Sequence, residues 1–303
     1  VTKRDGRVGL GYLLNHFGMV KGEATIANIP ASDRGPARAW YGSAAASEFH
    51  DMDWLRAHMS ADEDVQIRSI TNDQTILVLA GPKSRDVLSA CSRGDWSKAA
   101  FPWLSVRECF IGFAPATVMG VSFSGELAYE IHVPNASLYA AYTALREAGK
   151  AHDLKLFGAR AVESMRMEKG FLHWKADLIT EFDPFETALD RFVKLDKPDF
   201  IGRDALLKRK EAGPTKKFVS LEISTDKTPA LGGASLMQEG AVVGTITSGD
   251  WGHRIGKNLA YAFVDVSVSE VGTAMQLDLC GDIVDAQVIA AGPYDPEFAR
   301  IRS

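Results

Sequence analysis

The sequence predicts an α+β protein with more than one compact unit, and three observations support this. A chain of 303 residues is too long for a single hydrophobic core. Between about residues 70 and 155, the order strand, helix, two strands, helix is typical of a split βαβ, ferredoxin-like unit. After Gly213-Pro214 the apolar residues alternate between hairpin turns, which predicts a separate small β-barrel or sandwich.

The first part of the chain is predicted to form two strands and a helix. Residues 8–14 and 25–29 have strand composition, and Phe17-Gly18 between them favours a turn. Residues 47–59 have apolar side chains at helical spacing. They predict a helix that buries Phe49, Met52, Leu55 and Met59.

Helices and strands alternate through the middle of the chain. A short strand at residues 76–79 stops at Gly81-Pro82, and this proline can start a helix. Strands are expected at residues 116–123 and 129–133, followed by a helix from the cap Ser137 to Gly149. A last helix, at residues 159–169, has an apolar stripe of Ala161, Val162 and Met165.

Composition excludes several classes of function. The net charge is −5 and the pI is about 5.8, so nothing attracts the chain to nucleic acid or to an anionic membrane. Three distant cysteines, Cys91, Cys109 and Cys280, form no disulfide framework and suit a reducing compartment. No apolar run approaches the roughly 20 residues of a membrane helix. We expect a cytoplasmic protein, or one of the mitochondrial matrix if the source is eukaryotic.

Common catalytic motifs are absent. Gly9 and Gly11 begin a GxGxxG pattern, but Leu14 occupies the third glycine position, and no P-loop, GxSxG or HExxH occurs. The seven histidines have no ligand spacing, so no metal is expected.

Five phrases, in order along the chain, resemble one family. They are residues 79–85 (LAGPKSR), 122–131 (SFSGELAYEI), 164–171 (SMRMEKGF), 192–203 (FVKLDKPDFIGR) and 247–249 (TSG). These phrases are similar to segments of the glycine-cleavage T-protein, or aminomethyltransferase, family. The similarity is greatest to the folate-binding C-terminal region of dimethylglycine and sarcosine dehydrogenases.

The resemblance implies a cloverleaf of three small domains around a central folate cavity. The first domain would comprise residues 1–68 completed by 156–212, the ferredoxin-like domain 69–155, and the C-terminal β-barrel domain 213–303. The dehydrogenases carry a flavin domain ahead of this module, and the N-terminus here is expected to be shortened. FAD would therefore come only from a separate or missing oxidase domain or subunit.

The resemblance also assigns Glu23 as the catalytic carboxylate. Residues 14–23 (LNHFGMVKGE) resemble a family turn whose last residue is an aspartate near the folate nitrogens, and Glu23 takes that place. A carboxylate there can orient the amine nitrogen, accept its proton and stabilise developing positive charge. Without the resemblance, Glu23 would be an ordinary surface glutamate in a glycine-flanked turn.

Four further residues around the second and third phrases are candidates for binding tetrahydrofolate. Glu126 and Glu130 lie four apart on one predicted strand and would share a face, where a carboxylate can accept the paired pterin donors. Tyr129 would lie on the opposite face. Alternatively, one glutamate is buried in a structural hydrogen bond and the other is exposed. Arg166 can meet a pterin carbonyl or a glutamyl carboxylate, or pair with Glu163 in a helix salt bridge.

Trp174 completes the predicted site. It can stack on the pterin or aminobenzoyl ring, or serve as a core aromatic. The predicted function is tetrahydrofolate-dependent transfer of a methyl or methylene carbon from an N-methylated amine such as sarcosine or dimethylglycine, giving 5,10-methylenetetrahydrofolate. One alternative is a flavin-independent demethylase of a sulfonium, betaine or aryl methyl ether. Another is a non-catalytic folate-binding assembly factor, but the cysteine of that relative's signature is missing after Lys169-Gly170.

Overall fold

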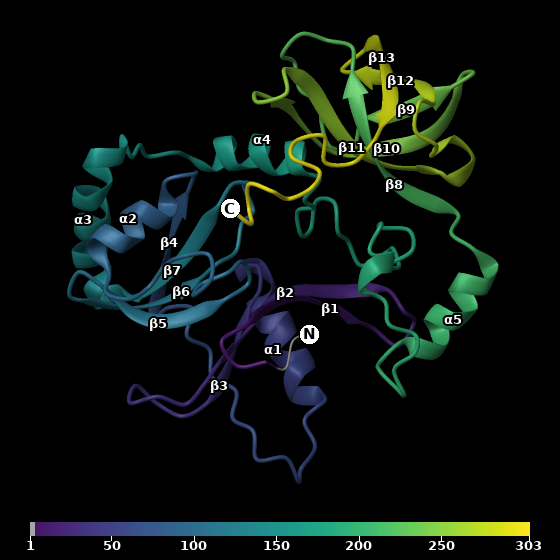
Figure 1. Cartoon of the computed structure of the whole chain (residues 1–303). Coiled ribbons are helices and arrows are strands. Elements are labelled where there is room, and N and C mark those ends of the chain that lie inside the picture. Colours follow the sequence, from purple (N-terminus) through teal and green to yellow (C-terminus); the bar gives the residue numbers. More distant parts are fainter. Residues whose placement is uncertain (1–3) are drawn as a thin grey trace.

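The computed structural model describes residues 4–303 and contains three β-sheets built from successive parts of the chain (Figure 1). The strands of the N-terminal sheet are β1 (Val8–Leu14), β2 (Val20–Ile29) and β3 (Arg38–Gly42). Those of the middle sheet are β4 (Gln74–Ala80), β5 (Val106–Ile111), β6 (Ala114–Met119) and β7 (Ala128–Pro134). The C-terminal barrel contains β8 (Lys216–Ile223), β9 (Ser235–Gln238), β10 (Ala241–Gly252), β11 (Lys257–Asp265), β12 (Ala274–Leu279) and β13 (Asp282–Ile289).

Five α-helices and five 3₁₀ turns join these strands within the described residues. The helices are α1 (Glu48–Ala57), α2 (Ser84–Cys91), α3 (Leu138–Gly149), α4 (Ala159–Lys169) and α5 (Arg203–Ala212). The turns are η1 (Ala45–Ser47), η2 (Asn135–Ser137), η3 (Lys150–His152), η4 (Asp190–Phe192) and η5 (Val266–Val268). Within residues 4–303, no helix is long and apolar enough to cross a membrane.

The N-terminal sheet is an antiparallel hairpin, β1–β2, extended by β3. Its β2 strand begins at Val20, five residues before the predicted start, so Glu23 lies on a strand and the prediction of a turn there was wrong. The turn is confined to residues 15–18, where Gly18 has a positive φ of 78°.

Helix α1 covers one face of the N-terminal sheet through a polar contact. Asp51 is 2% exposed, and it accepts a hydrogen bond from Tyr41 of β3. Phe49, predicted to be buried, is 83% exposed. The apolar spacing was misleading because a buried carboxylate with hydrogen-bond partners occupies the inner face of this helix.

The middle unit has two layers, with α2 and α3 over one face of the sheet β4-β7-β6-β5. The core between them contains Tyr129, Ile131 and Val133 of β7. The sheet has one strand more than predicted, β5, whose residues Arg107 and Glu108 weaken its apolar pattern. Its helix-free face packs on the N-terminal sheet, where Met119 meets Val8 and Ala27.

Helix α4 lies between the middle unit and the C-terminal barrel (Figure 1). It ends at Gly170 in a left-handed conformation, as predicted. Its buried face was predicted wrongly: Ala161 is exposed, whereas Arg166 and Glu168 are 0% exposed. Charged side chains occupy this face because each finds ionic partners on neighbouring segments.

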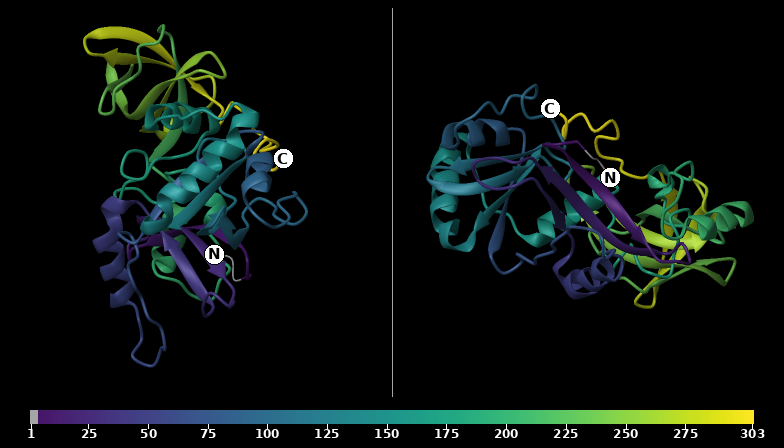
Figure 2. Two further views of the ribbon diagram at one scale, coloured as in Figure 1. Left: turned by 90° about the vertical axis from the view of Figure 1, so that its left-hand side faces the viewer. Right: turned by 90° about the horizontal axis from the view of Figure 1, so that it is seen from below.

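The C-terminal strands close in the order β10-β11-β8-β13-β12-β9, which confirms the predicted barrel. The α+β class is confirmed as well. Beyond β13 the chain returns over α4 to the middle unit (Figures 1 and 2). There Ile301 is 1% exposed, and Arg85 donates to the carbonyl of Ser303 at 3.0 Å.

The barrel wall makes a tight backbone contact at Gly249. A β-carbon at this position would lie 2.3 Å from the carbonyl oxygen of Ala230. We therefore expect Gly249→Ala to lower the free energy of unfolding by about 1–3 kcal/mol. Gly42→Ala is the matched control, because its β-carbon would meet only the Thr25 carbonyl oxygen, at 3.7 Å. Urea unfolding measures both; equal stability of the two variants would contradict the contact.

Candidate functional site

Glu23 lies on the face of β2 that is turned toward the middle unit. Strand alternation places its side chain on the same face as Ala27, which packs on the middle sheet. The hairpin register sets Tyr12 of β1 directly opposite, and the Tyr12 hydroxyl donates to Glu23 Oε1 at 3.1 Å. Asn15 fixes this register, because its side-chain oxygen accepts hydrogen bonds from the backbone N–H groups of Phe17 and Met19.

Burial controls the ionisation of Glu23. Loss of hydration raises its pKa from 4.5 to about 7, and the weaker effect of the Tyr12 hydrogen bond lowers it. Burial raises the pKa of Tyr12 as well, so this hydroxyl remains a donor at neutral pH. A carboxyl group with a pKa near neutrality can both take up and release a proton at working pH.

A cluster of apolar side chains supports this pair. The Phe192 ring meets the Tyr12 ring edge-on, with 4.9 Å between ring centroids. Trp174 belongs to the same cluster and is 6% exposed. Its indole N–H donates to Ser47 Oγ at 2.7 Å. Trp174 therefore has the surroundings of a core aromatic, in the cluster against which Tyr12 packs.

Glu130 lies on the helix-free face of the middle sheet, the face that packs on the N-terminal sheet. The adjacent His132 is on the same face and meets Trp40 of β3, with 5.2 Å between ring centroids. His132 Nε2 lies 3.2 Å from Glu130 Oε2, and the Glu130 side chain is 34% exposed. The two carboxylates, Glu23 and Glu130, thus project from facing sides of two packed sheets.

Glu126 does not lie on the strand of Glu130, contrary to the prediction. Strand β7 begins at Ala128, and Glu126 belongs to the preceding loop. Its Oε1 accepts hydrogen bonds from Arg254 at 2.9 Å and from the Tyr294 hydroxyl at 2.6 Å. This carboxylate ties the loop to the barrel and to the C-terminal segment.

Tyr129 faces away from Glu130, as strand alternation predicted. It is 1% exposed and lies in the helix-covered core, in contact with Trp96 and Phe101. The sheet therefore separates Tyr129 from the face that carries Glu130.

Arg166 is fully buried, and other protein groups accept all of its hydrogen bonds. Its five N–H groups point to Glu163, the Phe171 carbonyl, Asp177 and Ser248. Burial acts to lower its pKa, but the hydrogen bond to Glu163 and the charge of Asp177 outweigh this and raise the pKa. The helix salt bridge to Glu163 is present, and no N–H remains for a ligand.

Sequence reasoning missed Tyr12, His132 and Asp177. The Tyr12–Glu23 pair could have been found, because a tight turn at residues 15–18 fixes the hairpin register. His132 follows from alternation once Glu130 is chosen. No sequence signal marks Asp177, since its partners come from α4 and the barrel.

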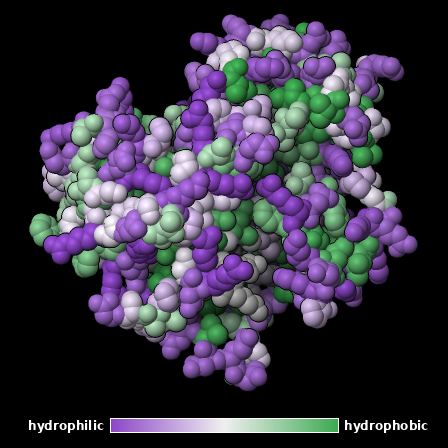
Figure 3. Space-filling model, in the orientation of Figure 1, coloured by the Kyte–Doolittle hydropathy of each residue, from purple (hydrophilic) through white to green (hydrophobic). Residues whose placement is uncertain are grey.

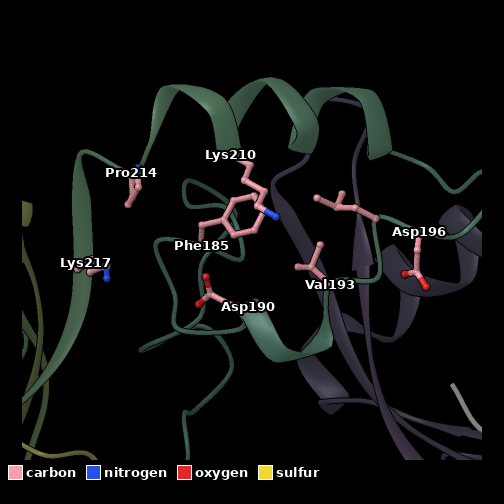
Figure 4. Close-up of a pocket in the computed structure, with 8 residues that line it drawn as sticks. Phe185, Asp190, Val193, Asp196, Lys210, Pro214 and Lys217 are labelled. Carbon is pink, nitrogen blue, oxygen red and sulfur yellow. The ribbon is translucent and has the colours of Figure 1, made fainter.

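A separate pocket of about 500 Å³ lies between η4, α5 and the start of β8 (Figure 4). Half-buried Phe185, Val193 and Pro214 contribute apolar surface, and Lys210 extends into it from α5. None of the predicted site residues lines it. Elsewhere, in the hollow beneath the barrel, apolar side chains gather on the face shown in Figure 3. Residues 4–303 contain no group of three His, Cys, Asp or Glu side chains placed to hold a metal ion.

Two family models together match most of the chain. Residues 1–197 match the GCVT N-terminal domain, and residues 216–295 match the glycine cleavage T-protein C-terminal barrel domain. The chain belongs to the glycine cleavage T-protein family. The crystal structure of aminomethyltransferase T of the glycine cleavage system from Bartonella henselae shares the T-protein fold. Its TM-score is 0.85 at 22% identity, over 97% of this chain and 77% of that one.

Two relatives of this T-protein family member are longer proteins. Human mitochondrial dimethylglycine dehydrogenase is 33% identical over 95% of this chain and 33% of its own length. Human mitochondrial sarcosine dehydrogenase is 30% identical over 100% of this chain and 35% of its own length. The chain therefore spans about a third of the length of these dehydrogenases.

We expect Glu23→Gln to stabilise the protein at pH 8 and to change its stability little at pH 5. Because folding raises the Glu23 pKa from 4.5 to about 7, the folded state holds this proton more tightly than the unfolded state. That stabilisation is present below pH 4.5 and is lost as the pH rises through 7.

The neutral amide has no charged form to bury, so the variant should be more stable than the parent at pH 8. We expect a difference of about 1–3 kcal/mol in the free energy of unfolding, a range that allows for the half-burial of Glu23. Urea unfolding at the two pH values measures the difference. If Glu23→Gln is less stable than the parent at pH 8, folding does not raise the pKa of Glu23 as described.

We expect Arg166→Lys to lower the free energy of unfolding by about 3–5 kcal/mol, because an ammonium group cannot reach all of the buried acceptors. Arg160→Lys in the same helix is the control. Its side chain is 81% exposed, so it should change stability by less than about 0.5 kcal/mol. If thermal or urea unfolding gave similar losses for both variants, the buried role of Arg166 would be refuted.

Proposed function

We propose that this chain is a folate-dependent one-carbon transfer module. It would take a carbon at the methylene level from an N-methylated amine and pass it to tetrahydrofolate, giving 5,10-methylenetetrahydrofolate. The observation that carries the proposal is Glu23, whose pKa of about 7 and hydrogen bond to Tyr12 set a proton-exchanging carboxyl on the inward face of the N-terminal sheet.

The residues on the facing sides of the N-terminal and middle sheets suit a reduced folate. Glu130 is partly exposed, and its contact with His132 involves Oε2, which leaves Oε1 for the paired N–H donors of a pterin. Leu10 and Val78 are 39% and 51% exposed, on the same sheet faces as Glu23 and Glu130 respectively. Partly exposed apolar side chains beside a partly exposed carboxylate suit a flat ring with a polar edge.

Glu23 would serve the proton transfers of the reaction. The Tyr12 bond occupies Oε1, which leaves Oε2 for the amine nitrogen. As a carboxylate it accepts the proton that the attacking nitrogen loses, and its negative charge stabilises the cationic carbon donor. The sheet packing that half-buries Glu23 also limits the water that would hydrolyse that donor. Bound tetrahydrofolate would supply the two nitrogens that bond to the carbon, and the demethylated amine would leave with the protons that these nitrogens lose.

The cationic carbon donor would be produced by a flavoprotein domain or subunit. Two-electron oxidation of an N-methylated amine by a flavin gives the iminium carbon that transfer requires. Two thirds of each of the two dehydrogenases lie outside the matched region, and the amines for which these relatives are named support dimethylglycine or sarcosine as the amine.

Calorimetric titration with folinic acid tests the binding half of the proposal. We expect saturable one-to-one binding, weakened about tenfold or more in Glu130→Gln by loss of a charge-assisted acceptor. Glu147→Gln is the control, because that side chain is 69% exposed on α3 and pairs with Lys150. Unchanged affinity in Glu130→Gln would remove it from the site, and no binding to the folded parent would refute the folate proposal.

Turnover tests the chemistry. A flavin-dependent sarcosine oxidase supplied in trans, with tetrahydrofolate and sarcosine, should yield more 5,10-methylenetetrahydrofolate and less free formaldehyde when the chain is present. Glu23→Gln should bind folinic acid but lose this effect. If the ratio of 5,10-methylenetetrahydrofolate to free formaldehyde is the same with Glu23→Gln as with the parent, the catalytic assignment of Glu23 is refuted.

A further inference from the structure

The Tyr12 hydroxyl has one hydrogen-bond partner among the described residues, Glu23 Oε1. The contact follows from strand register, because Tyr12 and Glu23 are paired across the hairpin. Side chains paired in this way have β-carbons about 5 Å apart, which suits a phenol reaching past a glutamate stem. The bond is therefore a consequence of the fold and does not require a ligand.

The Tyr12 ring is held in place by its neighbours. The Phe192 ring of η4 contacts it at an interplanar angle of 66°, and the cluster continues through Leu14, Val20 and Trp174. A ring fixed on two sides gives its hydroxyl a single direction. The Glu23 carboxylate, which accepts the hydrogen bond from this hydroxyl, is therefore restricted in its orientation.

We propose that Tyr12 is a positioning residue for Glu23, whose hydroxyl fixes one carboxylate oxygen and turns the other toward the reacting amine. The proposal rests on the proposed function, in which Glu23 handles the proton. Tyr12 acts through Glu23 and needs no contact with substrate or folate.

Within residues 4–303, few other charged groups act on this pair. Arg191 on η4 acts electrostatically on Tyr12, and Glu130 and His132 lie on the face of the middle sheet that packs on the N-terminal sheet. Lys21, two residues before Glu23, contacts His50 instead, at 2.8 Å. A hydrogen bond to the charged form of a carboxyl favours that form, so removing the hydroxyl should make Glu23 harder to ionise.

Tyr12→Phe tests this directly, because it removes the hydroxyl and keeps the ring against Phe192. The ¹³C resonance of the Glu23 carboxyl, identified by its loss in Glu23→Gln, is followed from pH 4 to 9. We expect its midpoint, about 7 in the parent, to rise by about one pH unit.

Tyr41→Phe is the matched control. It removes an equivalent tyrosine–carboxylate contact, to Asp51 at 3.3 Å, on the face covered by α1. The Glu23 midpoint should not move in this variant. An unshifted midpoint in Tyr12→Phe, or an equal shift in both variants, would overturn the proposal.

The second readout is the pH profile of folate-dependent transfer. A one-unit shift from a midpoint of 7 reduces the ionised fraction at pH 7 about fivefold, so kcat should fall by that factor and recover at higher pH. The double variant Tyr12→Phe/Glu23→Gln should have the same kcat as Glu23→Gln alone. If the midpoint shifts and the rate profile does not, the positioning role is refuted.

The nuclear magnetic resonance titration contains no folate, so failure of the proposed function and failure of the Tyr12–Glu23 coupling give different results. A shifted midpoint in a chain that does not bind folinic acid would refute the transfer function, and with it the positioning role. Transfer with an unshifted midpoint would refute only the positioning role.

Discussion

The buried pair Arg166–Asp177 is the constraint on which the arrangement of the three sheets depends. Asp177 Oδ2 accepts from Arg166 at 2.5 Å and from the His173 N–H at 2.9 Å, and its Oδ1 accepts from Ser248 at 2.7 Å. Helix α4, the segment after it and barrel strand β10 therefore meet at one carboxylate. Asp177 is fully buried with Arg166 as its ionic partner, so removing Arg166 would leave a buried charge unpaired, and this requirement holds the segments together.

This constraint reaches the candidate site through the segment that follows α4. Asp177 fixes the turn that carries Trp174 and Leu178, and these side chains pack against Val20 at the end of the β1–β2 hairpin. The hairpin register in turn sets Tyr12 opposite Glu23. The polar contact around Asp177 thus determines the surroundings of Glu23, although Glu23 takes no part in that contact.

The fold could be predicted further than the site. Hairpin spacing and Pro214 indicated the barrel, and Gly170 marked the end of α4, because these signals are local. The role of Arg166 could not be predicted from helical spacing, since its acceptors lie on Asp177 and Ser248, which are distant in sequence. The Glu126–Glu130 spacing was misleading for a related reason: partners on the barrel and the C-terminal segment keep Glu126 in a loop.

The central claim is that Glu23 and Glu130 face one folate site between the packed N-terminal and middle sheets. A crystal structure of the chain with folinic acid tests it most directly. The account predicts the pterin within hydrogen-bonding distance of Glu130 and the reactive nitrogens beside Glu23. Folinic acid bound instead in the pocket between η4, α5 and β8, with the space between the two carboxylates closed, would contradict it.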